Sequence, residues 1–113
     1  MNTNDGAAAA AEMPIVDVMR EAAVEAAGML RALGNPDRLL LLCQISMGER
    51  SVGELEVLVG LRQPSLSQQL GVLRQEGLVK TRREGKRIFY SIADPRLLAV
   101  LETLYQLYCP KPH

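Results

Sequence analysis

Residues 51–77 have the sequence SVGELEVLVGLRQPSLSQQLGVLRQEG, which predicts two helices joined by a short turn. Ser51 and Glu54 have the spacing of a capping box, in which each side chain satisfies a backbone N–H at the start of a helix. A second helix is expected to open at Pro64 and to stop at Gly77. A short helix, a brief connection and a longer helix together form the helix-turn-helix pattern.

The longer helix is predicted to have two different faces. Leu66, Leu70 and Leu73 fall on one stripe and should face a core. The opposite face has small hydroxyl and amide side chains, which suit a helix in a DNA major groove, since Gln can bond adenine twice and Ser can bond bases or phosphates. Helix pairs of proteins that do not bind DNA also have polar outer faces. The candidate DNA contacts here are Gln63, Ser65, Ser67, Gln68, Gln69 and Arg74.

The segment LVKTRREGKRIFYSI, residues 78–92, predicts a β-hairpin with its turn at Glu84-Gly85. A hairpin directly after a recognition helix forms a wing. Basic side chains on a wing can reach phosphates or the minor groove of duplex DNA. The basic residues around the expected tip are Arg82, Arg83, Lys86 and Arg87.

The charge of the chain is formally zero but unevenly distributed. Residues 62–87 contain seven basic and two acidic residues, a net +5, and the remainder contains six basic and eleven acidic residues, a net −5. Such a layout directs one face toward an anion, although an ordinary solvated basic hairpin would have the same composition. Three Tyr, one Phe and no Trp offer few stacking platforms for single strands, so double-stranded DNA is the expected partner.

The rest of the chain is predicted to be helical. Apolar residues recur at helical spacing over residues 14–33, and Asn35 and Asp94 each precede a proline as helix N-caps. We expect Gly48 to close the helix that Asn35 opens, and the final helix to run to about Cys109. The predicted fold is mainly α with a small β-hairpin, a winged helix-turn-helix in the order α-α-α-α-β-β-α.

Length and composition predict one domain. With 113 residues, 48% of them apolar, the chain can build a single small core, and we expect a homodimer to complete its burial. Residues 1–12 should form a disordered tail and residues 13–113 the domain. The acidic N-terminus is unlike a secretory signal and no run of about 18 apolar residues occurs, so a cytoplasmic protein with no membrane partner is expected.

The segments NPDRLLLLC, SVGELEVLVGL, RQPSLSQQLGVLRQEGLV and TRREGKRIFY resemble the ArsR-type winged-helix repressors, over about residues 17–109. The resemblance implies a dimer formed through the first and last helices, a pseudo-palindromic operator and release by an inducer. Many members sense metals through a CxC pair at the short helix, or through Asp and His in the last helix. Neither set occurs here, and His113 is terminal, so we expect no metal site and no cofactor.

Cys43 and Cys109 are the only cysteines of the chain. Their positions resemble those of the persulfide-sensing sub-branch (the SqrR and BigR type). In that branch, reactive sulfur species bridge the two thiols within a subunit and the repressor releases sulfide-detoxification genes. The alternative within the family is a general redox- or thiophilic-metal-responsive repressor with the same cysteines. Cys43 alone, beside four leucines, would usually be a small core residue.

An enzyme is disfavoured, because the sequence has no CxxC pair, no basic partner beside either thiol and no glycine-rich cofactor loop.

The distance between the two thiols could make the protein selective for reactive sulfur species, and this is our hypothesis. A disulfide needs Cα atoms roughly 4.4–6.8 Å apart, so thiols held farther apart would accept a bridge with one or two extra sulfur atoms more easily than a direct bond.

Overall fold

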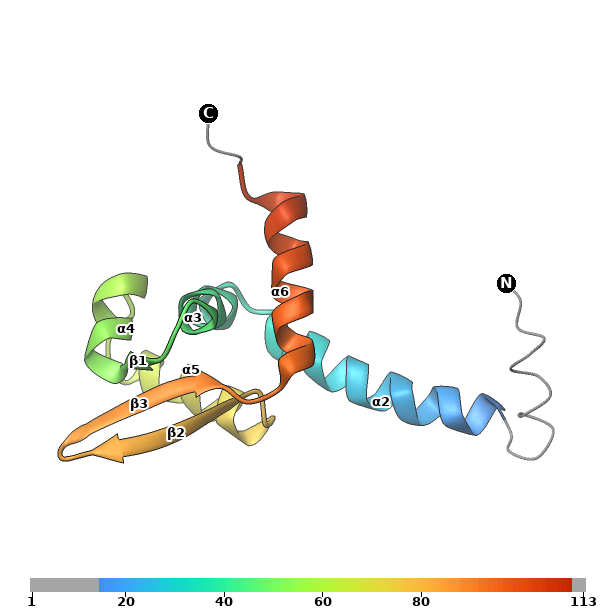
Figure 1. The fold of residues 1–113 in the computed structure, drawn as a ribbon, viewed down its shortest axis with the longest axis horizontal. Helices are drawn as coiled ribbons and strands as arrows, with labels where there is room; N and C mark the ends of the chain where they lie inside the picture. The colour runs from blue at the N-terminus through green and yellow to red at the C-terminus, as the bar shows by residue number, and fades with distance from the viewer. Residues whose placement is uncertain (1–14, 111–113) are drawn as a thin grey trace.

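The computed structural model of the chain describes residues 15–110 (Figure 1). The elements in order are α2 (Ile15–Leu33), α3 (Pro36–Ser46), β1 (Arg50–Ser51), α4 (Val52–Val59), α5 (Ser65–Gln75), β2 (Val79–Glu84), β3 (Arg87–Ile92) and α6 (Pro95–Tyr108). The mainly helical winged helix-turn-helix is confirmed. The predicted tail, residues 1–12, lies outside the described residues, and the domain boundary at residue 13 stays a prediction.

The predicted helix caps are present. The Asn35 side chain accepts a hydrogen bond from the Arg38 N–H at 3.1 Å. The Ser51 hydroxyl accepts from the Glu54 N–H at 3.2 Å, and the Glu54 carboxylate accepts from the Ser51 N–H at 2.8 Å, so both halves of the capping box form. The Asp94 side chain caps α6 by accepting a hydrogen bond from the Arg96 N–H. α3 ends at Ser46, slightly before the expected stop at Gly48.

The wing belongs to a three-stranded antiparallel sheet with the order β1-β3-β2. The hairpin is confirmed, and the structure adds β1, in which Arg50 pairs with Tyr90 and Ser51 with Phe89. Two residues are too few for an alternating pattern, so the sequence did not reveal this strand. Its consequence is that the start of α4 is fixed directly to the wing.

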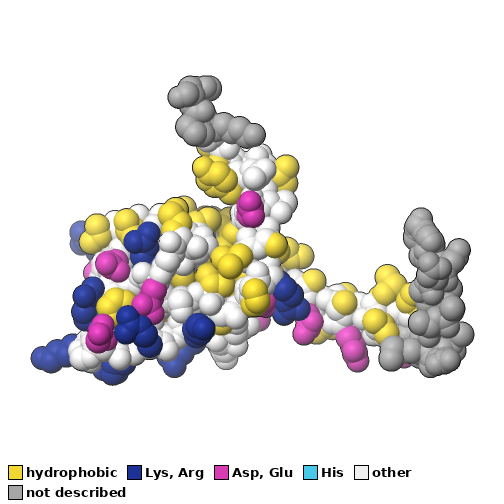
Figure 2. All heavy atoms as spheres, viewed as in Figure 1, with side chains coloured by type: hydrophobic (Ala, Val, Ile, Leu, Met, Phe, Trp, Pro, Cys, Tyr) yellow, Lys and Arg dark blue, Asp and Glu magenta, His cyan; other side chains and the backbone are white. Residues whose placement is uncertain are grey.

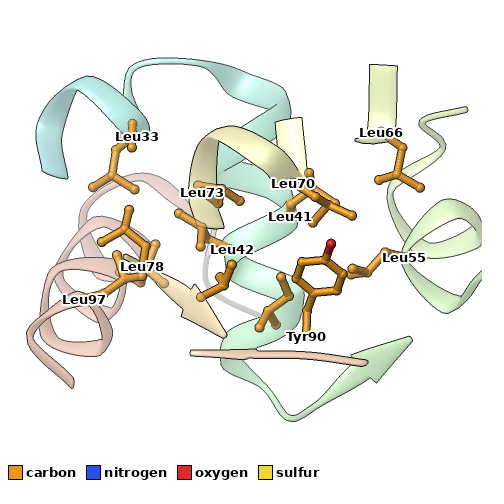
Figure 3. Packing of buried hydrophobic residues seen from close by; sticks show 14 residues of the cluster. Leu33, Leu41, Leu42, Leu55, Leu66, Leu70, Leu73, Leu78, Tyr90 and Leu97 are labelled. Carbon is orange, nitrogen blue, oxygen red and sulfur yellow. The ribbon is translucent and has the colours of Figure 1, made fainter. Parts of the chain in front are cut away.

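One core of leucines holds these elements together (Figure 3). α3 lies at its centre and packs against α2, α4, α5, α6 and β3. Full burial of a leucine contributes about 1.5–3 kcal/mol, so this cluster dominates the stability of the fold. The leucines with no exposed surface are Leu41, Leu42, Leu55, Leu66, Leu73 and Leu97.

Two helical segments project from this core. We call residues 36–92 the head, and α2 together with residues 102–109, the end of α6 and its C-cap, the arms. Figure 1 shows α2 and α6 leaving the head in different directions. Only Ala32 and Leu33 are buried in α2, and Leu107 and Tyr108 are 70% and 79% exposed near the end of α6. None of the helices within residues 15–110 combines the length and apolarity needed to cross a bilayer.

Candidate DNA interface and thiol pair

The recognition helix α5 has the two faces that its sequence predicts. Its three stripe leucines are buried in the core. On the outer face, the side chains of Ser65, Ser67, Gln68 and Arg74 are exposed. These small polar groups can therefore approach a groove without displacing any core residue.

Gln63 has a structural partner on the same face. α5 has no side-chain cap from its own N-cap residue, Pro64. The Gln63 side-chain oxygen instead accepts a hydrogen bond from the Ser67 N–H at 3.3 Å, and it also accepts one from the Ser67 hydroxyl. Gln63 therefore satisfies one of the free N–H groups at the start of α5 and orients the Ser67 hydroxyl.

Gln69 is only partly exposed, and its amide oxygen accepts a hydrogen bond from Arg38 Nη1 at 3.0 Å. The same guanidinium donates to the carbonyl oxygens of Ala32 at 2.7 Å and Arg31 at 3.1 Å, in the last turn of α2. Arg38 thus joins an arm to the recognition helix. Gln69, predicted as a DNA contact, thus shares its amide oxygen with Arg38, a residue that the sequence gave no local reason to select.

The basic residues of the wing fall into two groups, and the first is held by intramolecular contacts. Arg82 donates from Nε and Nη2 to the two carboxylate oxygens of Glu49, both at 2.8 Å. Arg87 donates to the Ser51 hydroxyl at 3.2 Å. Both guanidinium groups lie over the Phe89 ring, 4.6 and 4.8 Å from its centroid, within the range of a cation–π interaction.

Arg82 and Glu49 shift each other's pKa. The hydrogen bonds from Arg82 hold the pKa of the Glu49 carboxyl below its usual value. Glu49 in turn raises the pKa of Arg82, with a smaller contribution from Glu84, whose carboxylate lies 3.5 Å from Arg82 Nη1. Both side chains therefore stay charged at neutral pH.

The second group is Arg83 and Lys86, which are exposed and form no ion pair with any residue between 15 and 110. Figure 2 shows dark blue Lys and Arg side chains gathered on the side of the head where the hairpin lies. The predicted basic tip is present, and its free cations are these two. Arg82 and Arg87 would have to exchange partners to bind phosphate through the same donors.

The two thiols lie on neighbouring helices, since α3 packs against α6. Cys43 is half-buried against the core, whereas Cys109 is exposed at the C-cap of α6, where its N–H donates to the Tyr105 carbonyl at 3.0 Å. Burial raises the pKa of the Cys43 thiol, and the negative charge of the Cys109 thiolate raises that pKa further. The exposed Cys109 thiol and the half-buried Cys43 thiol therefore differ in their access to solvent.

A metal site would need a third ligand beside these thiols. No three His, Cys, Asp or Glu side chains gather in the part of the chain that the structure describes. His113 lies outside that part.

Comparison with known proteins agrees with this architecture. Residues 35–81 match the family described as "Bacterial regulatory protein, arsR family". The chain is 49% identical over 98 residues to the biofilm growth-associated repressor of Agrobacterium fabrum, covering 87% of this chain and 83% of that protein. This chain belongs to the arsR family. The prediction of a transcriptional regulator, and of a protein that is not an enzyme, is confirmed at this level.

Solved structures of relatives share the fold. The transcriptional repressor BigR from Xylella fastidiosa superimposes with a TM-score of 0.78 at 45% identity, covering 84% of this chain and 97% of that one. Reduced HlyU from Vibrio cholerae superimposes with a TM-score of 0.77 at 40% identity, covering 81% and 97%. The arsR-family chain described here therefore has relatives of known structure over nearly all of their length.

Proposed function

We propose that this arsR-family protein is a homodimeric repressor that binds operator DNA and releases it when reactive sulfur species bridge Cys43 and Cys109 within one subunit. The genes released would serve sulfide detoxification. The observation that supports this most directly is that Cys43 lies on α3 and Cys109 caps α6, two helices that pack against each other. The target, chromosomal DNA, implies a cytoplasmic protein.

DNA contact is assigned to α5 and the wing. Ser65, Ser67 and Gln68 are offered to the bases, with Gln63 orienting Ser67. Arg74, Arg83 and Lys86 are offered to phosphates, which contribute most of the salt-dependent affinity of such proteins.

The dimer is assigned to the arms. Apolar side chains left exposed on α2 and α6 are the surface that a second copy of the chain would cover, as the yellow patches in Figure 2 illustrate. In such a dimer, two recognition helices must lie about 34–36 Å apart to enter successive major grooves. The large exposed apolar residues of the arms include Val16, Met19, Val24, Leu30, Tyr105, Leu107 and Tyr108.

We infer the order of the sulfur-transfer steps from the different exposure of the two thiols. The exposed Cys109 thiolate attacks the outer sulfur of a small persulfide, forms a Cys109 persulfide and releases the carrier as its thiolate. A second transfer extends it to a Cys109 hydrotrisulfide. The Cys43 thiolate then attacks the sulfur next to the terminal one, forming a trisulfide bridge and expelling HS⁻. Over the whole sequence the two cysteines lose two electrons, one each, and the persulfide sulfur that leaves as HS⁻ is the group that is reduced.

The bridge would reach the DNA through α3. It would fix the end of α6 to α3, and α3 contains Arg38, which holds both Gln69 of the recognition helix and the last turn of α2. A change in the angle between arm and head would therefore change the spacing of the two recognition helices. Allosteric effects of this kind typically amount to about 1–3 kcal/mol, or roughly 5–150-fold in affinity.

Fluorescence anisotropy with a labelled duplex from the promoter of the protein's own gene tests the proposal. Persulfide treatment should weaken DNA binding by the wild type roughly 5–150-fold. It should leave the affinity of Cys43→Ser and Cys109→Ser unchanged, because neither variant can form the bridge. Equal loss of affinity in the two variants would refute the role of the thiols. Parallel samples with peroxide, zinc and arsenite distinguish the alternative, a general redox- or metal-responsive repressor using the same cysteines.

A further inference from the structure

Among the basic residues of the wing, Arg82 has a two-point contact with a carboxylate. Its Nε and Nη2 atoms donate to both oxygens of Glu49, which precedes β1 and lies 33 positions away in sequence. The partners are joined across the sheet, because β3 lies between β1 and β2. Arg82 is opposite Phe89 in the strand pairing, and its guanidinium lies over that ring.

The donors that hold Glu49 are the donors that a phosphate would use. A guanidinium presents a planar pair of N–H groups that fits the two oxygens of a carboxylate or of a phosphate equally well. The side chains of Arg82 and Glu49 are 51% and 35% exposed, so a phosphate can approach them. Exposed ion pairs contribute little to stability because water screens both charges, which makes exchange easy.

We propose that Glu49 is an intramolecular competitor of DNA phosphate that occupies Arg82 in the free protein and is displaced when the wing meets the DNA backbone. This inference rests on the proposed DNA contact of the wing. Phe89 retains the guanidinium in both states, because the ring contacts its face while the exchange takes place at its edge. Glu49 therefore sets the affinity for DNA without contacting DNA.

Competition by Glu49 predicts the direction in which the DNA affinity changes when this carboxylate is removed. Each binding event that uses Arg82 must first release Glu49, so the carboxylate lowers the affinity for every duplex, whatever its sequence. Removing the Glu49 carboxylate leaves Arg82 only the longer contact with Glu84, at 3.5 Å from Nη1, and makes its Nε and Nη2 donors available to a phosphate. The affinity should rise, and the dependence of log K on log salt should become steeper by about one for one additional phosphate contact.

The test compares Glu49→Gln with Glu56→Gln, in titrations of a labelled 24-bp duplex of random sequence at several salt concentrations. Glu56 is an exposed carboxylate of α4 that makes no ion pair within residues 15–110, so its variant has the same change in net charge. We expect Glu49→Gln to bind about three- to tenfold more tightly than the wild type and to show the steeper slope, and Glu56→Gln to change affinity less than twofold. Equal gains in both variants would reduce the effect to net charge and overturn the proposal.

The same substitution in an Arg82→Gln background completes the test. If Glu49 acts through Arg82, its replacement changes nothing once Arg82 is absent. A gain that persists in this background, or weaker binding by Glu49→Gln alone, would show that Glu49 does not compete with phosphate. Thermal melts of each variant verify the fold. A wild type that binds no duplex at low salt would refute the proposed function itself, whereas a binding wild type with an unresponsive Glu49→Gln would refute only this inference.

Discussion

Leu42 in the head and Leu107 in an arm are the same amino acid in opposite surroundings. Leu42 has no exposed surface, whereas 70% of Leu107 is exposed. Each head helix buries leucine within one chain: Leu41 and Leu42 of α3, Leu55 of α4, and Leu66, Leu70 and Leu73 of α5. The arms leave comparable side chains uncovered along α2 and at the end of α6. The head is thus determined by one copy of the sequence, and the arms have the composition of a surface that a second copy completes.

The largest expected effect separates these two leucines. Leu42→Ala should lower the free energy of unfolding by about 2–5 kcal/mol, because it opens a cavity in the core. Leu107→Ala removes the same atoms from an exposed site and should act through the dimer alone. Urea unfolding at two protein concentrations measures both. The loss in Leu42→Ala should be independent of concentration, whereas the loss in Leu107→Ala should shrink on dilution, because wild type and variant then both become monomeric and the proposed dimer no longer contributes. An equal loss in both variants at every concentration would contradict the distinction between head and arms.

A smaller effect is expected where arm and head join. Arg38→Ala should lower the free energy of unfolding by about 1.5–3 kcal/mol, since it removes three charge-assisted hydrogen bonds to α2 and Gln69. Gln69→Ala breaks only one of them and should lower it by about 1 kcal/mol. Operator affinity, measured on the same samples, should fall in both. Unchanged operator affinity in Arg38→Ala would show that the contact between α2 and the recognition helix has no influence on DNA binding.

The smallest effect concerns the reactivity of the reduced thiols, one in the head and one in an arm. Cys109 should react with iodoacetamide faster than Cys43 at pH 7.5, because it is exposed while Cys43 is half-buried. Burial, together with the charge of Cys109, raises the pKa of Cys43, so labelling of Cys43 should need a higher pH than that of an ordinary cysteine. Peptide mass spectrometry after timed labelling measures both rates, and faster labelling of Cys43 would reverse the proposed order of sulfur transfer.

Local signals predicted most of the fold. Caps at Asn35, Ser51 and Asp94 depend on residues a few positions apart, and a sequence displays such pairs directly. β1 escaped prediction because its two residues pair with β3, about 40 positions away. The burial of the leucine stripe of α5 was equally predictable, since helical periodicity alone assigns it to the core.

The candidate site was less predictable, because its side chains choose partners from distant segments. Arg82 and Arg83 are neighbours of the same type, yet Arg82 is held by Glu49 and Arg83 is free of ion pairs within residues 15–110. Gln69 likewise bonds Arg38, from another helix. Charge and composition predicted a DNA-facing surface, and only the tertiary structure separates the free groups of that predicted surface from those held by intramolecular contacts.

The central claim is that Cys109, at the end of an arm, can be tied to Cys43 in the head of the same subunit. Intact-mass and non-reducing peptide mass spectrometry of dilute protein after persulfide treatment tests it most directly. We expect one linked Cys43–Cys109 peptide within a single chain, heavier than the plain disulfide by one or two sulfur atoms of about 32 Da each. Bridges between two chains, or a modified Cys109 that never links to Cys43, would contradict it.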